Sequence, residues 1–303
     1  MAMNREELLK AIDEKYQAIG QNPDVHLSGL LHAEPITYWD YIQVEALLGL
    51  QIKRTNLPDE MVFIMYHQIN ELLFKMVLWE IGQVKEPGLT TAKFAVHLDR
   101  ISRYFDMLSQ SFSIMGDGME KEQYMKFRDT LTPASGFQSA QYRLIEFAST
   151  DVINLVDGRY RAGFDASNTE NAYEHLYWQA AGKNYHTGQK NALLSNFEKK
   201  YKAEFLEVID KNRSGNLWHI FKSLPESERV NETLVKAMRH YDYTVNVTWV
   251  MAHLNAARKY LGNAEATGGS DWQKYMHPKY QKRIFFPGLW SEEELANWGL
   301  NLD

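Results

Sequence analysis

Apolar residues recur every three or four positions along most of this chain, which is the spacing of an amphipathic α-helix. A first helix is expected to begin near Asn4, whose spacing to Glu7 is that of a capping box. Asp59 is expected to cap a long helix, and Ser291 a short last one. The pattern predicts further helices over 38–50, 60–84, 94–112, 120–131, 137–148, 171–180, 189–211, 215–223 and 227–261.

The fold class predicted by this pattern is all-α, because no alternating stretch indicates a strand. There is no repeat of fixed period and no low-complexity linker. We therefore expect residues 1–303 to form one helical-bundle domain, with the irregular segment 150–188 packed on its outside. Residues 20–36, with Pro23 and Pro35, are expected to form an extended loop.

Composition and charge exclude several classes of protein. The net charge of -6 offers no basic face for nucleic acid. The absence of cysteine excludes disulfides, cysteine-ligated zinc, iron–sulfur clusters and covalent c-type haem. No apolar run approaches the ~20 residues that span a bilayer, and the charged N-terminus does not resemble a signal peptide. We expect a cytoplasmic protein without nucleic-acid or membrane partners.

His67 lies in the segment FIMYHQINELLF, at 63–74, on an otherwise apolar helix. Its helical neighbours include Phe63, Asn70, Glu71 and Phe74. One interpretation is a core histidine bonded to a neighbouring carboxylate. The other is a polar group at the edge of an apolar cavity, where it can form one hydrogen bond to a ligand.

His253 lies in WVMAHLNAARKYLG, at 249–262, and has Ala252, Ala256 and Ala257 among its helical neighbours. Small side chains around a histidine leave room for a flat, wide group such as a haem with an axial imidazole. Alanine is also simply a good helix former, so an ordinary bundle helix remains open.

Arg128 follows Tyr124 by one helical turn in YMKFRDTLTPASGFQS, at 124–139. It is either a surface arginine paired with Asp129 or Glu122, or a bidentate clamp for a carboxylate, which the planar guanidinium suits. Free N–H groups where Ser135 and Gly136 are expected to open the next helix also favour an anion.

Thr267 begins TGGS, at 267–270, after the end of a predicted helix. The segment lacks the lysine and the length of a phosphate-binding loop. It is either a flexible turn or a mobile lid whose hydroxyl and carbonyl groups can meet an ammonium group.

These four segments, in their order along the chain and at their intervals, together with TYWDYI at 37–42, resemble the tryptophan 2,3-dioxygenase family. The resemblance extends from about 37 to 290 and is faint across 150–225. It implies a helical fold that binds haem b between its helices. It also implies a homotetramer in which residues 1–50 are exchanged with a neighbouring subunit.

The resemblance assigns a role to each candidate residue. His253 is implied as the axial ligand of a ferrous haem iron, and His67 as the acceptor for the indole N–H of L-tryptophan. Arg128 and Thr267 are implied to hold the carboxylate and the ammonium group. The pocket wall is implied to contain Phe63, Tyr124 and Phe127. Ser135 and Gly136 are implied to border the distal face of the haem. The exchanged segment is implied to bring Tyr38, Tyr41 and Ile42 to the active site of a neighbouring subunit.

The implied reaction is cleavage of the indole C2–C3 bond by O2 to give N-formyl-L-kynurenine, the first step of tryptophan degradation by the kynurenine pathway. Two alternatives stay open. One is a related haem-dependent monooxygenase acting on tryptophan or an indole derivative, and the other a helical haem-binding protein without turnover. The chain departs from the family at Tyr66, Ala266, Ile42, Phe112 and the loop 116–123.

Overall fold

The computed structural model describes residues 3–131, 136–184, 187–261 and 277–300. Within these ranges every regular element is helical, and strand-like pairing is limited to two isolated bridges, Val156–Leu176 and Lys183–Lys190. The all-α prediction is therefore confirmed. Contacts group the chain into two units, Met1–Gln51 and Ile52–Asp303. That the two belong to one domain stays a prediction.

The first unit begins with α1 (Arg5–Ala18), and the Asn4–Glu7 capping box expected from the sequence is present. The predicted extended loop at 20–36 is wrong, because α2 (Pro23–Leu30) occupies its centre. Pro23 stands at the start of that helix, where its missing N–H costs nothing and its fixed φ is already helical.

The single helix predicted at 38–50 is instead two short ones, α3 (Tyr38–Ile42) and α4 (Val44–Leu48). Gln43, between them, has a φ of 54°, a left-handed conformation that ends the first helix. Thr37 caps α3, since its side chain accepts a hydrogen bond from the Asp40 N–H.

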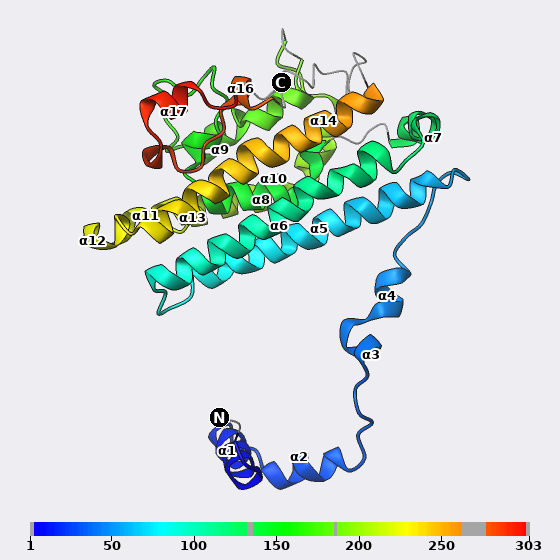
Figure 1. The fold of residues 1–303 in the computed structure, drawn as a ribbon, viewed down its shortest axis with the longest axis vertical. Coiled ribbons are helices and arrows are strands. Elements are labelled where there is room, and N and C mark those ends of the chain that lie inside the picture. Colours follow the sequence, from blue (N-terminus) through cyan, green and yellow to red (C-terminus); the bar gives the residue numbers. More distant parts are fainter. Residues whose placement is uncertain (1–2, 132–135, 185–186, 262–276, 301–303) are drawn as a thin grey trace. The chain divides into compact units, whose positions relative to one another are not determined.

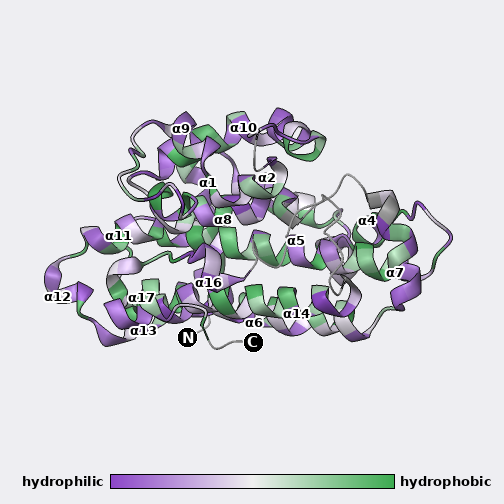
Figure 2. Cartoon of the chain, turned by 90° about the horizontal axis from the view of Figure 1, so that it is seen from above, coloured by the Kyte–Doolittle hydropathy of each residue, from purple (hydrophilic) through white to green (hydrophobic). Residues whose placement is uncertain are grey.

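Three long, nearly parallel helical segments form one layer of the second unit. In Figure 1, α6 (Thr91–Asp117) lies between α5 (Asp59–Val84), at the edge, and the run of α13 (Glu232–Tyr243) and α14 (Trp249–Leu261). Figure 2 shows hydrophobic residues recurring along α5, α6 and α14. Among the described helices, none is both long and apolar enough to cross a membrane.

Two predictions for these helices need correction. The helix expected over 227–261 begins later, at Glu232, because α12 (Glu226–Arg229) is separate from it. From Glu232 the chain is helical to Leu261, with the π-helical turn η5 (Thr244–Thr248) joining α13 to α14. Asp59 is the first residue of α5 rather than its cap. Its carboxylate instead accepts a hydrogen bond of 2.6 Å from the Glu120 N–H.

A second group of helices packs behind this layer. It contains α8 (Ala140–Ser149), α10 (Ala192–Asn212) and α11 (Leu217–Ser223). The prediction that 150–188 packs on the outside is wrong, because its Leu155, Tyr173, Leu176, Tyr177 and Trp178 belong to the main core. The remaining elements are short: α7 (Lys121–Phe127), η1 (Arg128–Leu131), η2 (Gly136–Gln138), η3 (Val152–Leu155), α9 (Thr169–Glu174), η4 (Tyr177–Gly182), α16 (Pro278–Gln281), η6 (Pro287–Leu289) and α17 (Glu292–Ala296), the last capped by Ser291 as expected.

A buried ionic cluster joins α8 to the C-terminal segment. The guanidinium groups of Arg143 and Arg283 lie 3.0 and 3.2 Å from the carboxylate of Glu146, which is fully buried. Tyr177 donates to Glu146 at 2.6 Å, and Arg283 donates to the Tyr142 hydroxyl at 3.1 Å. Two buried cations thus share one carboxylate, so this carboxylate matters greatly to the stability of the fold.

Candidate active site

A cavity of about 480 Å³ lies between α5, α6 and α14, with α7 and the start of α8 closing it. Its size falls within the ~300–1,000 Å³ typical of ligand pockets. The described residues that line it are mostly aromatic or apolar, with a few polar groups among them: Phe63, Tyr66, His67, Asn70, Glu71, Phe74, Phe112, Met115, Tyr124, Arg128, Gln138, Ser139, Tyr142, Trp249, His253, Ala256, Ala257 and Tyr260.

His253 lies on α14 and faces this cavity, with Ala256 and Ala257 beside it on the wall. Its ring lies parallel to that of Phe112, with centroids 5.1 Å apart, and no described residue forms a hydrogen bond to it. Burial, helped by the nearness of His67, lowers the pKa of His253 to about 4. The imidazole is therefore neutral near pH 7, the form that ligates a metal.

His67 faces the same cavity from α5. Its Nδ1 lies 2.8 Å from the Phe63 carbonyl oxygen, one turn earlier on the helix. A carbonyl oxygen can only accept, so Nδ1 carries the proton when the ring is neutral, and Nε2 is left as an acceptor. Burial lowers the pKa of His67, which favours this neutral form. His67 can accordingly accept one hydrogen bond from a ligand.

Arg128 lies where α7 passes into η1, and its side chain lines the cavity while being buried. The alternative of a surface arginine is therefore wrong. Tyr124, one turn earlier, lines the cavity as well, and burial raises the pKa of its phenol. A buried guanidinium beside a neutral phenol suits a ligand carboxylate.

The aromatic wall continues behind these groups. Phe63 lines the cavity and contacts His67 at a centroid distance of 4.1 Å. Phe127 is fully buried behind that wall, where its ring meets those of Phe63 and Tyr124 edge-on. Its contribution is therefore to hold the wall rather than to line the cavity.

Several lining residues were missed by the sequence analysis as site residues. Trp249 precedes His253 by four residues on one helix face, so the helical period could have identified it. Ser139 ends the Arg128 segment and Tyr142 follows three residues later, but only the fold brings them to the cavity. Tyr260 is brought to the cavity by tertiary packing, and its ring centroid lies 4.7 Å from that of Tyr124. No local sequence pattern predicts this position.

The remaining predicted site residues are Ser135, Gly136, Thr267 and three residues of the first unit. Ser135 and Thr267 lie outside the described residues. Gly136 opens η2 rather than α8, which begins at Ala140 with Ser139 as its cap. Three residues of the first unit are exposed on α3, and their proposed contact with a neighbouring subunit stays a prediction: Tyr38, Tyr41 and Ile42.

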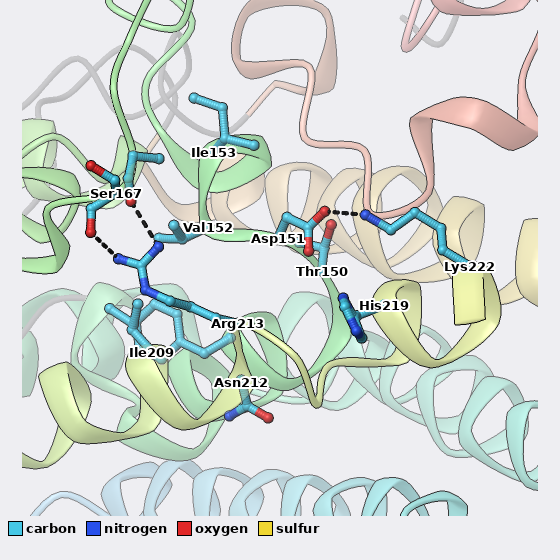
Figure 3. A pocket seen from close by; sticks show the side chains of 12 residues that line it. Thr150, Asp151, Val152, Ile153, Ser167, Ile209, Asn212, Arg213, His219 and Lys222 are labelled. Atoms are coloured by element: carbon cyan, nitrogen blue, oxygen red, sulfur yellow. Dashed lines mark hydrogen bonds and ion pairs between the residues drawn. The ribbon is translucent and has the colours of Figure 1, made fainter.

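A second cavity, of about 370 Å³, lies beside α10 and α11. Figure 3 shows that its charged side chains already have partners. Arg213 donates to the carbonyl oxygens of Ala166 and Ser167, and Lys222 pairs with Asp151 at 2.7 Å. The cavity of His67 and His253 is therefore the stronger candidate for chemistry.

Comparison with known proteins agrees with this geometry. The family model described as tryptophan 2,3-dioxygenase matches residues 28–177, which include His67 and Arg128. The chain is 29% identical over 275 residues to a protein of Bacillus anthracis with that name, covering 85% of this chain and 92% of the relative. The chain resembles the tryptophan 2,3-dioxygenase family.

Two further relatives carry the same name. A tryptophan 2,3-dioxygenase of Myxococcus xanthus (strain DK1622) is 26% identical over 271 residues, which are 84% of this chain and 87% of the relative. One of Ruegeria sp. (strain TM1040) is 38% identical over 129 residues, or 42% of this chain and 46% of the relative. Similarity to the Myxococcus xanthus protein extends well beyond residues 28–177, the stretch that the family model matches.

Proposed function

We propose that this protein is a haem-dependent dioxygenase that cleaves the indole C2–C3 bond of L-tryptophan with O2 to give N-formyl-L-kynurenine. The observation that carries the proposal is the meeting of His253, His67 and Arg128 around one cavity. Each residue comes from a different helix, so their convergence results from the fold. Similarity to the tryptophan 2,3-dioxygenase family supports the same reaction.

The residues around His253 fit a haem. Its imidazole is neutral, lies against the cavity and forms no hydrogen bond to a described residue. Ala256 and Ala257 leave space for a flat ring beside the helix, and Phe74 and Phe112 add apolar wall. His253 would hold the iron, and the bound haem would supply the activation of O2 that no side chain can provide.

The remaining side chains position the substrate. Arg128 would hold the carboxylate of the amino acid at one end of the cavity, and Nε2 of His67 would accept the indole N–H. A ligand held at two such points loses little further freedom on reaction. The aromatic wall would keep water away from the indole. This chain would therefore contribute the orientation of the substrate and the exclusion of water from the reaction.

The reaction is tested with isotopically labelled O2. We expect the reduced, haem-loaded protein to convert L-tryptophan to N-formylkynurenine that carries both labelled oxygen atoms, as measured by mass spectrometry. A hydroxylated indole with one labelled atom would instead indicate a related monooxygenase. Full haem loading with no product from tryptophan or indole derivatives would indicate a haem protein without turnover.

The two polar contacts to the substrate should differ in strength. A charge-assisted contact contributes ~1.5–3 kcal/mol and a neutral hydrogen bond ~0.5–1.5 kcal/mol. We expect Arg128→Met to weaken L-tryptophan binding about 10- to 150-fold, and His67→Ala about 2- to 13-fold. Titration of the haem absorption band with tryptophan measures both.

Arg128→Lys is the matched control for the first variant, because it keeps the charge and removes the planar fork. Its affinity should fall between those of wild type and Arg128→Met. Each variant must retain the haem content of the wild type. Equal losses for Arg128→Met and His67→Ala would show that the carboxylate is held elsewhere.

We also propose that the protein works in the cytoplasm as a homotetramer with exchanged N-terminal segments. The first unit supports the exchange, because Pro23 is the single buried residue among those described there. Many of its large apolar side chains are exposed and need a partner surface: Leu8, Ile19, Val25, Leu30, Leu31, Ile36, Tyr38, Trp39, Tyr41, Leu48 and Leu50.

A further inference from the structure

The outer face of α5 is apolar over four helical turns. Met65, Ile69, Leu72, Met76 and Trp79 are 40%, 41%, 47%, 43% and 69% exposed. Their spacings of four, three, four and three residues place them in one stripe about 21 Å long. We call these five residues the α5 stripe.

The α5 stripe differs from the outer faces of the other long helices. α6 exposes Lys93, Asp99, Arg100 and Arg103 together with a few apolar residues, as a solvated helix does. α10 exposes Lys199, Lys200, Glu204 and Glu207. Between Met65 and Trp79, by contrast, Lys75 is the single exposed residue among the Asp, Glu, Lys and Arg side chains. A helix with apolar residues on every side is normally covered on every side.

The opposite face of α5 is already occupied by the candidate active site. Phe63, His67 and Phe74 line the cavity from that side. The helical period turns the α5 stripe roughly 160° away from His67. The stripe therefore cannot be part of the ligand cavity, and it requires another covering surface.

The order of residues in the stripe is self-complementary. Met65 and Trp79 are equally distant from Leu72, and Ile69 and Met76 nearly so. A twofold axis through Leu72 would pair each apolar residue of one copy with an apolar residue of another, which is the arrangement of an isologous interface.

An antiparallel orientation also suits the charges of this helix. It places Lys75 of one copy near the neutral amide of Gln68 in the other, so the two ammonium groups stay apart. It brings the positive end of each helix dipole beside the negative end of its partner, whereas a parallel pairing sets like ends together. From these observations we propose that α5 packs antiparallel against α5 of a second copy of this chain, about a twofold axis at Leu72.

This inference rests on the proposed homo-oligomer and adds the surface and orientation by which two copies meet. It also links assembly to the site, because one helix carries His67 on one face and the subunit contact on the other. Separation of the copies would expose the stripe to water and loosen the helix that places Phe63 and His67 on the cavity wall.

The chain contains no cysteine, so introduced cysteines report contacts between copies directly. In the full-length, haem-loaded protein, Leu72→Cys alone should form covalent dimers with a short bismaleimide. The double variant Met65→Cys/Trp79→Cys should also cross-link, whereas each of its single variants should not. Met107→Cys, on an exposed apolar residue of α6, is the matched control and should stay uncross-linked.

A second experiment measures assembly by sedimentation velocity. Leu72→Glu should weaken self-association about 100-fold or more, because two buried carboxylates would meet at the axis. Met107→Glu should sediment like the wild type, and circular dichroism should show that both variants are folded. Unchanged assembly of Leu72→Glu, or cross-linking of Met65→Cys with itself, would overturn the antiparallel α5 contact.

The outcomes separate this inference from the proposed function. An oligomeric wild type in which Leu72→Cys does not cross-link would show that another segment covers the stripe. A monomeric wild type would overturn both the α5 contact and the homotetramer. Haem content and formation of N-formylkynurenine are measured on the same samples and test the catalytic proposal independently of either result.

Discussion

His253→Ala is expected to lose most of its haem. The variant removes the one imidazole that faces the cavity from α14, and the remaining lining residues beside it are apolar. Haem content per subunit, measured from the pyridine haemochrome, should fall well below one half of the wild-type value. Imidazole added to the solution should restore part of the haem absorption, because it can occupy the space left by the side chain.

His219→Ala is the matched control, since His219 lines the second cavity and is remote from the proposed haem ligand. It should retain the haem of the wild type. If His253→Ala kept full haem with an unchanged absorption band, the axial ligand would be another residue. His67, the second histidine of the cavity, would then be the first to test.

Glu146→Gln should destabilise the fold more than any surface substitution. The change leaves the buried guanidinium groups of Arg143 and Arg283 without their carboxylate. Removing one partner of a buried ionic group typically costs ~3–5 kcal/mol in the free energy of unfolding. For a chain of this size that corresponds to a fall in melting temperature of about 5–15 °C, measurable by circular dichroism.

Asp210→Asn provides the comparison, because Asp210 pairs with Arg213 while 61% of its side chain is exposed. Exposed ion pairs contribute ~0–1 kcal/mol, so the loss of stability should be small. If both substitutions lowered the melting temperature equally, Tyr142 and Tyr177 would have to satisfy the two arginines on their own.

The sequence predicted the all-α fold and most helices, because the apolar period in those segments is regular. It also identified His67, His253 and Arg128, which the structure brings to one cavity although 186 positions separate the first from the second. The residue pattern left an ordinary structural alternative open for each of the three, and the family resemblance favoured the site. The functional roles of these residues remain predictions.

The parts that the sequence did not predict depend on single backbone positions or on tertiary contacts. The left-handed Gln43 splits one predicted helix, and Pro23 begins a helix where a loop was expected. Tyr142 and Tyr260 reach the cavity through packing of distant helices. The π-helical turn η5 has no distinct composition, and its residues are compatible with an ordinary helix.

That turn has a consequence for how the site can change. η5 lies immediately before α14, so the direction of the His253 side chain depends on one additional residue in the backbone. Deletion of that residue would restore an uninterrupted helix and rotate the imidazole by about 100° relative to α13, away from the cavity. The length of this segment should therefore tolerate no deletion, even where its individual side chains can be exchanged.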